Sequence, residues 1–152
     1  MESDADPVAK LAGELGYAVD PKVMRIRVEA VLASPADLLV VAVDASDHAV
    51  GWLQAHAAQI IESGFRVEIT GLIVSPEFRR DGAGRLLVNR AEEWARSLSA
   101  EAVVVRSNAR RVESHSFYPA LGYTATKTQN VYRKALPDVS KSLLASADSS
   151  PH

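Results

Sequence analysis

The stretch Arg79-Arg80-Asp81-Gly82-Ala83-Gly84, residues 79–84, follows a strand-like apolar run and opens an amphipathic helix pattern. Glycine has no Cβ, so Gly82 and Gly84 let the backbone turn tightly and come close to a ligand. The first amides of a helix have no partner inside the helix, and together with the helix dipole they attract anions. Flanking arginines can hydrogen-bond phosphate oxygens. The stretch predicts a pyrophosphate-binding loop; the alternative is an ordinary surface loop whose arginines pair with Glu77 and Asp81.

The residues on both sides of this loop predict a succession of strands and helices. Apolar residues at helical spacing, with caps and stops, predict helices at 7–15, 21–33, 83–98 and 112–121. Apolar and β-branched runs between turn residues predict strands at 38–43, 49–60, 65–74 and 102–105, and the alternating region 123–136 predicts one final strand or two. A strand, a glycine loop, a helix and a strand in succession form a βαβ unit, so the strands 65–74 and 102–105 should be parallel.

Length and composition place the chain among ordinary globular domains. Its 152 residues are 47% hydrophobic and 24% charged, and we expect one domain over residues 1–136 with a flexible C-terminal tail at 137–152. The net charge of −2 gives no general basic surface for nucleic acid. Cysteine is absent, which excludes disulfides and a cysteine nucleophile. No apolar run is long enough to span a bilayer and the start is acidic, so we expect a cytoplasmic protein.

Two familiar phosphate-binding signatures do not fit the loop. The phosphate loop of nucleotide triphosphatases needs Gly-Lys-Ser or Gly-Lys-Thr, whereas Gly84 is followed by Arg85 and Leu86. A dinucleotide-binding fold needs a third glycine where this chain has Leu87, and the strands that precede the loop are expected to be antiparallel. Neither reading accounts for the sequence.

A third pattern covers far more of the chain. Residues 74–84 resemble the acyl-CoA-binding signature of the GCN5-related N-acetyltransferases, which Arg79, Gly82 and Gly84 satisfy. Downstream, Phe117-Tyr118-Pro119-Ala120-Leu121-Gly122-Tyr123 is similar to the closing aromatic and glycine pattern of the same family. The resemblance covers roughly residues 38–136. It implies an α/β (α+β) fold with a mixed central sheet flanked by helices, lacking the usual first strand if residues 1–6 form none.

The resemblance also implies which residues bind acetyl-CoA and which perform the chemistry. Tyr118 stands where the family places the acid that protonates the departing thiolate. The backbone of Ile73 and Val74 would pair with the pantetheine arm, and Leu72 with Ile73 would help to hold the acetyl carbonyl. The backbone amides that would hold the pyrophosphate are those of Arg79, Arg80, Asp81, Gly82, Ala83 and Gly84.

Acyl transfer to an amine also needs a proton acceptor, because the amine is mostly protonated at neutral pH. Glu68, the one acid within the run 65–74, is our candidate; the alternative is that it pairs with Arg66, Arg106 or another cation across the sheet. His56 on the preceding strand is a second candidate, with a structural role as its alternative. The remaining side chains that could approach the cofactor are His115, Asn108, Arg110 and Arg111, whereas Trp52 and Trp94 are expected to pack.

These observations lead to one hypothesis of function. We expect an acetyl-CoA-dependent N-acetyltransferase that transfers acetyl directly, in a ternary complex, to a primary amine of a small molecule or peptide. We expect no metal, no nucleic acid and no membrane partner, and a possible homodimer. Two alternatives are a non-catalytic acyl-CoA-binding regulatory module and an interaction protein in which the glycines only form a loop.

Overall fold

The computed structural model describes residues 20–79, 81–106 and 114–137. The chain divides into two compact units, Met1–Ser114 and His115–His152. The expected helix at 7–15 and the question of a first strand therefore lie outside the described residues. The domain boundary at residue 136 stays a prediction.

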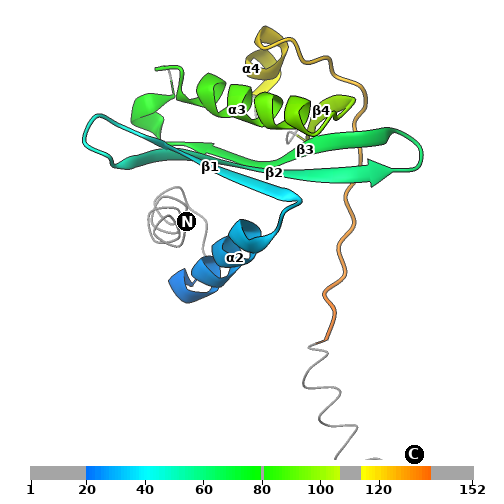
Figure 1. Ribbon diagram of the computed structural model, residues 1–152, viewed down its shortest axis with the longest axis horizontal. Helices are drawn as coiled ribbons and strands as arrows, with labels where there is room; N and C mark the ends of the chain where they lie inside the picture. Colours follow the sequence, from blue (N-terminus) through cyan, green and yellow to red (C-terminus); the bar gives the residue numbers. More distant parts are fainter. Residues whose placement is uncertain (1–19, 80, 107–113, 138–152) are drawn as a thin grey trace, which may run out of the picture. The chain divides into compact units, whose positions relative to one another are not determined.

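The first unit is built on a four-stranded sheet in the order β1-β2-β3-β4. Its strands are β1 (Asp37–Val43), β2 (Ala49–Ile60), β3 (Gly64–Val74) and β4 (Ala102–Val105). Neighbouring strands run antiparallel from β1 to β3, and β3 and β4 run parallel. Figure 1 shows the crossover from β3 to β4 through α3 (Ala83–Ser97). The predicted βαβ unit and mixed sheet are confirmed.

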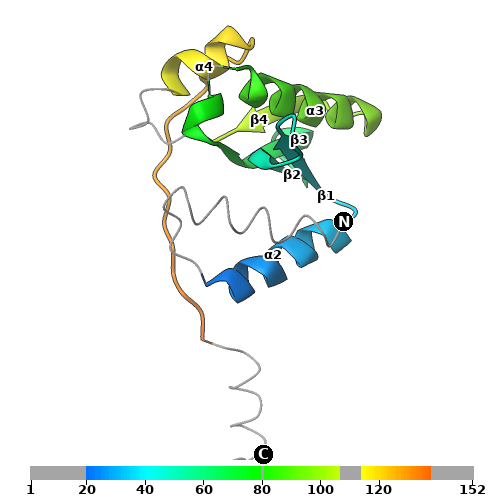
Figure 2. The ribbon, with the colours of Figure 1, turned by 90° about the vertical axis from the view of Figure 1, so that its left-hand side faces the viewer.

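Two helices cover the sheet from opposite faces (Figures 1 and 2). Helix α2 (Pro21–Ala33) begins at Asp20, whose side chain accepts the Lys22 amide at 2.7 Å, as expected of an N-cap before a first-turn proline. Its buried Val28 packs with partly buried neighbours from the helix and the sheet, namely Met24, Leu32, Leu39, Val41 and Trp52. Trp52 is therefore a packing residue, as predicted.

Helix α3 packs on the other face, where the main core lies. Its sheet side is apolar and fully or nearly fully buried, whereas Leu86 on its outer side is 65% exposed. The sheet meets this helix closely: a Cβ on Gly51 would stand 3.3 Å from Leu87 and 2.9 Å from the carbonyl oxygen of Ile73. The core between the sheet and α3 includes Leu53, Ala55, Val67 and Ile69 from the strands and Leu87, Val88, Ala91 and Ala95 from the helix.

A bulge in β3 decides which side chains face each helix. Gln54 pairs with Gly71 and Ala55 pairs with Ile69, so Thr70 is an extra residue opposite β2. Paired residues share a face, which puts Glu68 on the α2 face opposite His56, and Leu72 on the α3 face opposite Leu53. The strand thus presents the acid Glu68 and the partly buried Leu72, four positions apart, on opposite faces.

Helix α4 spans Ser114–Ala120, and all of it except Ser114 belongs to the second unit. An extended segment follows the helix. Pro119 stands in the last turn of α4, which ends one residue later. Residues 123–137 form no helix or strand, so the predicted final strand or strands at 123–136 are wrong. An alternating pattern supplies suitable side chains for a strand, but a strand also needs hydrogen bonds to a neighbour, which the pattern alone does not supply.

Two adjacent leucines of α3 test the packing. Leu87→Ala should lower the free energy of unfolding by about 2–5 kcal/mol, because Leu87 is 2% exposed and its loss leaves a cavity. Leu86→Ala, with the same change in helix propensity, should alter it by about 0.5 kcal/mol or less, since Leu86 is mostly exposed. Urea unfolding measures both; equal losses would contradict the orientation of α3.

Candidate active site

The pairing between the two parallel strands, β3 and β4, ends about halfway along β3. The β3 to β4 pairing runs from Arg66 with Ala102 to Ile69 with Val105 and stops there. Strand β3 continues to Val74 with β2 as its only strand partner among the described segments. Five residues of β3 thus present one backbone edge that no described strand covers. Such an edge can hydrogen-bond an extended ligand as an added strand would.

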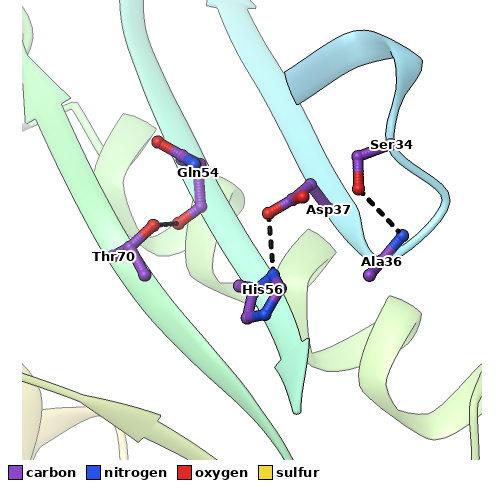
Figure 3. A network of polar contacts seen from close by, with 6 residues as sticks. All are labelled: Ser34, Ala36, Asp37, Gln54, His56 and Thr70. Carbon is purple, nitrogen blue, oxygen red and sulfur yellow. Dashed lines mark hydrogen bonds and ion pairs between the residues drawn. The ribbon is translucent and has the colours of Figure 1, made fainter. Parts of the chain in front are cut away.

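The bulge lies at the point where the strands part. Thr70 follows Ile69 directly, and its hydroxyl donates to the carbonyl oxygen of Gln54 at 3.4 Å, as Figure 3 shows. A bulge bends and twists a strand and commonly ends its pairing. The bulge thus coincides with the residue after which the β3 to β4 pairing ends. Predicted residues Leu72, Ile73 and Val74 all lie on this edge-bearing segment.

A short connection leads from β3 to the glycine loop. The amide of Ser75 donates to the carbonyl oxygen of Val50 at 2.7 Å, and the 3₁₀ turn η2 (Pro76–Phe78) follows. The Nε of Arg79 donates back to the carbonyl oxygen of Val74 at 3.2 Å. This hydrogen bond holds the start of the loop to the end of β3.

The loop ends at the N-terminus of α3 with features that suit an anion. Gly82 is the N-cap with φ of 83°, a left-handed conformation that favours glycine, and a Cβ there would meet no atom within 4 Å. No side chain caps the helix and no acid stands in its first turn. The Asp81 amide donates to the carbonyl oxygen of Phe78 at 3.2 Å and so already has a partner within the loop. Residues Ala83 and Gly84 are buried at the helix start.

Glu68 lies inside the sheet with a cationic partner. Its side chain is 18% exposed and forms an ion pair and hydrogen bond with the Nε of Arg106, which follows β4 directly. Arg66, the other expected partner, donates instead to the hydroxyl of Ser63 at 3.3 Å. The structure thus selects Arg106 from the two predicted partners. The contact is made by one of the two carboxylate oxygens, Oε1 of Glu68.

His56 also has a charged partner that the sequence did not reveal. Its Nδ1 lies 3.0 Å from Oδ1 of Asp37, at the first residue of β1 (Figure 3). The start of β1 is fixed locally, because the Ala36 amide donates to the Ser34 hydroxyl at 3.3 Å and the Ala57 amide to the Ala36 carbonyl at 2.8 Å. Our predicted strand began at Leu38. Extending the hairpin register by one residue would have placed Asp37 opposite His56.

Tyr118, the predicted acid, belongs to the second unit. It lies in α4, partly buried, with ring centroids 4.9 Å from Phe117 and 6.0 Å from Tyr123 in edge-to-face arrangements. Its carbonyl oxygen accepts the amides of Leu121 at 3.0 Å and Tyr123 at 3.1 Å, which closes the turn at Gly122. The aromatic and glycine pattern of the sequence is thus a compact helix end.

Several predicted contacts fall on residues that the structure does not describe. These are Arg80, Asn108, Arg110 and Arg111, together with the side chain of His115. In the described ranges no three or more His, Cys, Asp or Glu side chains are grouped to hold a metal ion. The helices of those ranges include none with the length and apolar character needed to cross a membrane.

Fold and site together define a class of protein. A mixed sheet whose parallel strands separate beside a glycine-started helix is suited to bind an elongated ligand along the strand and its phosphates at the helix. The chain belongs to the acetyltransferase (GNAT) family, whose model matches residues 7–123. The protein is accordingly an enzyme of the N-acetyltransferase class, and the predicted family and fold are confirmed.

Solved structures share this fold at low sequence identity. An aminoglycoside antibiotic 6'-N-acetyltransferase from Acinetobacter baumannii is 20% identical with a TM-score of 0.78, covering 90% of this chain and 95% of its own. An aminoglycoside N-acetyltransferase in complex with CoA is 19% identical with a TM-score of 0.79, covering 89% and 91%. A transcriptional regulator from Bacillus halodurans is 22% identical with a TM-score of 0.76, covering 88% and 95%. No curated protein matches the chain.

Gly82 tests the anion site. Gly82→Val should weaken CoA binding at least about tenfold, because a branched side chain would fill the open space that the phosphates need. Gly64→Val is the control: Gly64 also has a positive φ, of 86°, but is the first residue of β3, at the strand's other end, where a Cβ would displace the carboxylate of the Glu101 side chain. Calorimetric titration with CoA measures both affinities. Equal affinities in the two variants would remove Gly82 from the site.

Proposed function

We propose that the protein transfers an acetyl group from acetyl-CoA to a primary amine within a ternary complex. The observation that carries the proposal is the continuous path from the uncovered edge of β3 to the open, uncapped start of α3. An extended thiol arm suits the edge and a pyrophosphate suits the helix start. The residues present therefore fit CoA. The CoA-bound structural relative supports the same ligand.

The chain's residues would act mainly by position and by charge. Acetyl-CoA supplies an activated thioester when bound. The backbone amides of Leu72 and Ile73 are proposed to stabilise the negative charge that develops on the acetyl oxygen. The uncovered edge and the Gly82 loop would hold the donor still beside the acceptor, which removes much of the entropic barrier of a two-substrate reaction.

Two proton transfers complete the proposed reaction. Glu68 takes a proton from the acceptor nitrogen, directly or through a water molecule, so that the nitrogen lone pair can attack. Tyr118 gives a proton to the departing thiolate, since a phenol with a usual pKa of about 10 can protonate a thiolate. The acceptor ammonium loses a second proton to solvent as the amide forms, and the phenolate regains one from solvent, so each cycle releases one net proton. Support for Glu68 is its place beside the bulge on β3, and support for Tyr118 is its place in the family pattern.

The proposal also covers the class of acceptor and the oligomeric state of the protein. Two of the structural relatives are an aminoglycoside acetyltransferase and an enzyme bound to an acetylneamine bisubstrate analogue, which favours a small polyamine as the first acceptor to test. We include a cytoplasmic homodimer in the proposal. The exposed apolar side chains Val131 and Leu136 of the last described segment support it, and sedimentation equilibrium of the purified protein measures its mass.

The reaction itself is tested by release of CoA. Purified protein with acetyl-CoA and kanamycin, spermidine, lysine or a peptide with a free N-terminus should release free thiol with at least one acceptor, together with the acetylated product by mass spectrometry. Tight CoA binding with no turnover on any acceptor would favour a non-catalytic acyl-CoA-binding module. Absence of CoA binding would leave only the loop reading of residues 79–84.

Tyr118→Phe separates chemistry from binding. We expect kcat to fall about a hundredfold, because the hydroxyl donates the proton, while the Kd for acetyl-CoA stays unchanged. Tyr132→Phe is the matched control and should keep the wild-type rate, since that ring is 89% exposed in the extended segment. Steady-state kinetics and calorimetry supply the two readouts. A wild-type kcat in Tyr118→Phe would remove the assigned role.

A further inference from the structure

Four charged or ionisable side chains form a row across one face of the sheet. Asp37 on β1 pairs in register with His56 on β2, and His56 pairs with Glu68 on β3. Glu68 lies opposite Val104 on β4, and Arg106 is two residues further, so it returns to the same face. We name these four residues the polar row. It lies on the α2 face, beyond the apolar contacts that Val28 makes with the sheet.

The polar row consists of two bonded pairs placed side by side. Asp37 holds His56 at 3.0 Å, and Arg106 holds Glu68. Both acids are largely buried, with 16% and 18% of their side chains exposed, whereas His56 is 45% exposed. Of the two neighbouring side chains at the centre of the row, His56 therefore reaches solvent more than Glu68 does. A proton on Glu68 has this ring as its cross-strand neighbour on the way out.

The contact with Asp37 determines what the ring can do. An ionised carboxylate only accepts hydrogen bonds, so Nδ1 of His56 carries the hydrogen in this contact. In the neutral ring Nε2 is then the acceptor. Directly opposed residues of antiparallel strands have Cβ atoms about 4.5–5.5 Å apart. Two side chains as long as His56 and Glu68 can therefore exchange a proton directly or through one water molecule.

We propose that His56, held by Asp37, relays to solvent the proton that Glu68 takes from the acceptor amine. This inference rests on the proposed function. The N–H bond of the attacking nitrogen breaks and its proton moves to the free carboxylate oxygen of Glu68. Glu68 passes the proton to Nε2 of His56, and the imidazolium gives a proton to water. Glu68 returns to the carboxylate that Arg106 holds, and no electron is gained or lost.

The roles within the polar row differ. Glu68 faces the acceptor and is the proposed base, whereas His56 acts through Glu68. Asp37 and Arg106 are positioning residues: one fixes the ring and its tautomer, and the other fixes the carboxylate. A relay matters because the enzyme must lose a proton in every cycle, and a largely buried carboxylate exchanges with bulk water through its neighbours.

His56→Gln is the first test. Glutamine keeps a donor for Asp37 but cannot carry a proton, so kcat should fall about a hundredfold on whichever panel amine wild type acetylates fastest, with an unchanged KM for acetyl-CoA. His48→Gln is the matched control. His48 also pairs with an aspartate, its Nδ1 lying 3.7 Å from Oδ2 of Asp44, but it is 79% exposed in the turn between β1 and β2. It should keep the wild-type rate.

His56→Ala supplies a readout that a structural role would not move. Imidazole in the assay buffer should restore its kcat in proportion to concentration, because free imidazole can occupy the vacated space and carry the proton. The same imidazole should leave His56→Gln and Glu68→Gln slow, since glutamine fills the first site and the second lacks the base. Thermal melting of each variant, with and without CoA, checks that it is folded.

The outcomes separate this inference from the proposed function. Wild-type kcat in His56→Gln, or a slow His56→Ala that imidazole does not restore, overturns the relay while acetyl transfer stands. Wild-type protein that releases no CoA with any acceptor overturns both. Loss of rate in His56→Gln with rescue of His56→Ala supports the relay.

Discussion

The limited pairing between β3 and β4 is the constraint on which the rest of the site depends. Four residue pairs join the two strands, and five further residues of β3 continue beyond them. A sheet edge in the middle of a protein has to be paired or covered because its amides and carbonyls need hydrogen-bond partners. Here the edge lies next to a helix start that also has free donors. Among the described residues, no strand pairs with this edge of β3 and no side chain caps the start of α3, which suits a long ligand that carries its anionic groups at one end.

Electrostatics on the sheet follow from register rather than from any local cluster in the sequence. The polar row spans seventy positions of the sequence. Three of its residues, Asp37, His56 and Glu68, lie on neighbouring strands at the same level of the sheet, and Arg106 directly follows the fourth strand. Their charges partly cancel within pairs, which lowers the cost of keeping two acids largely out of water. Elsewhere on the sheet the hairpin turn uses the same chemistry locally. The backbone amides of His48 and Ser46 donate to Asp44 and hold the pKa of that carboxyl below its usual value.

Local signals made much of the fold predictable, and long-range pairing explains what was missed. Helix 21–33 was predicted with its observed bounds because Asp20 and Pro21 mark its start chemically, and strand 102–105 because its apolar run is sharply bounded. The segment 123–136 has an equally regular pattern but forms no strand, because strand formation depends on a hydrogen-bonding neighbour that the pattern does not specify. The glycine loop could be located from sequence, since Gly82 needs its positive φ. The Asp37 contact could not be seen without the hairpin register, and the choice of Arg106 over Arg66 required the parallel pairing of β4.

The extra residue at the bulge has a consequence for how the length of this strand can change. If Thr70 were deleted, Ile69 would still face α3 and Gly71 would still face α2, so the core could keep every side chain where it is. Packing therefore gives no reason to retain the insertion, and Thr70 itself is exposed. Its contribution is the bend that turns the end of β3 away from its neighbour. A chain without this residue would keep the side-chain faces of the core but would lack the local bend and twist that a bulge gives to a strand.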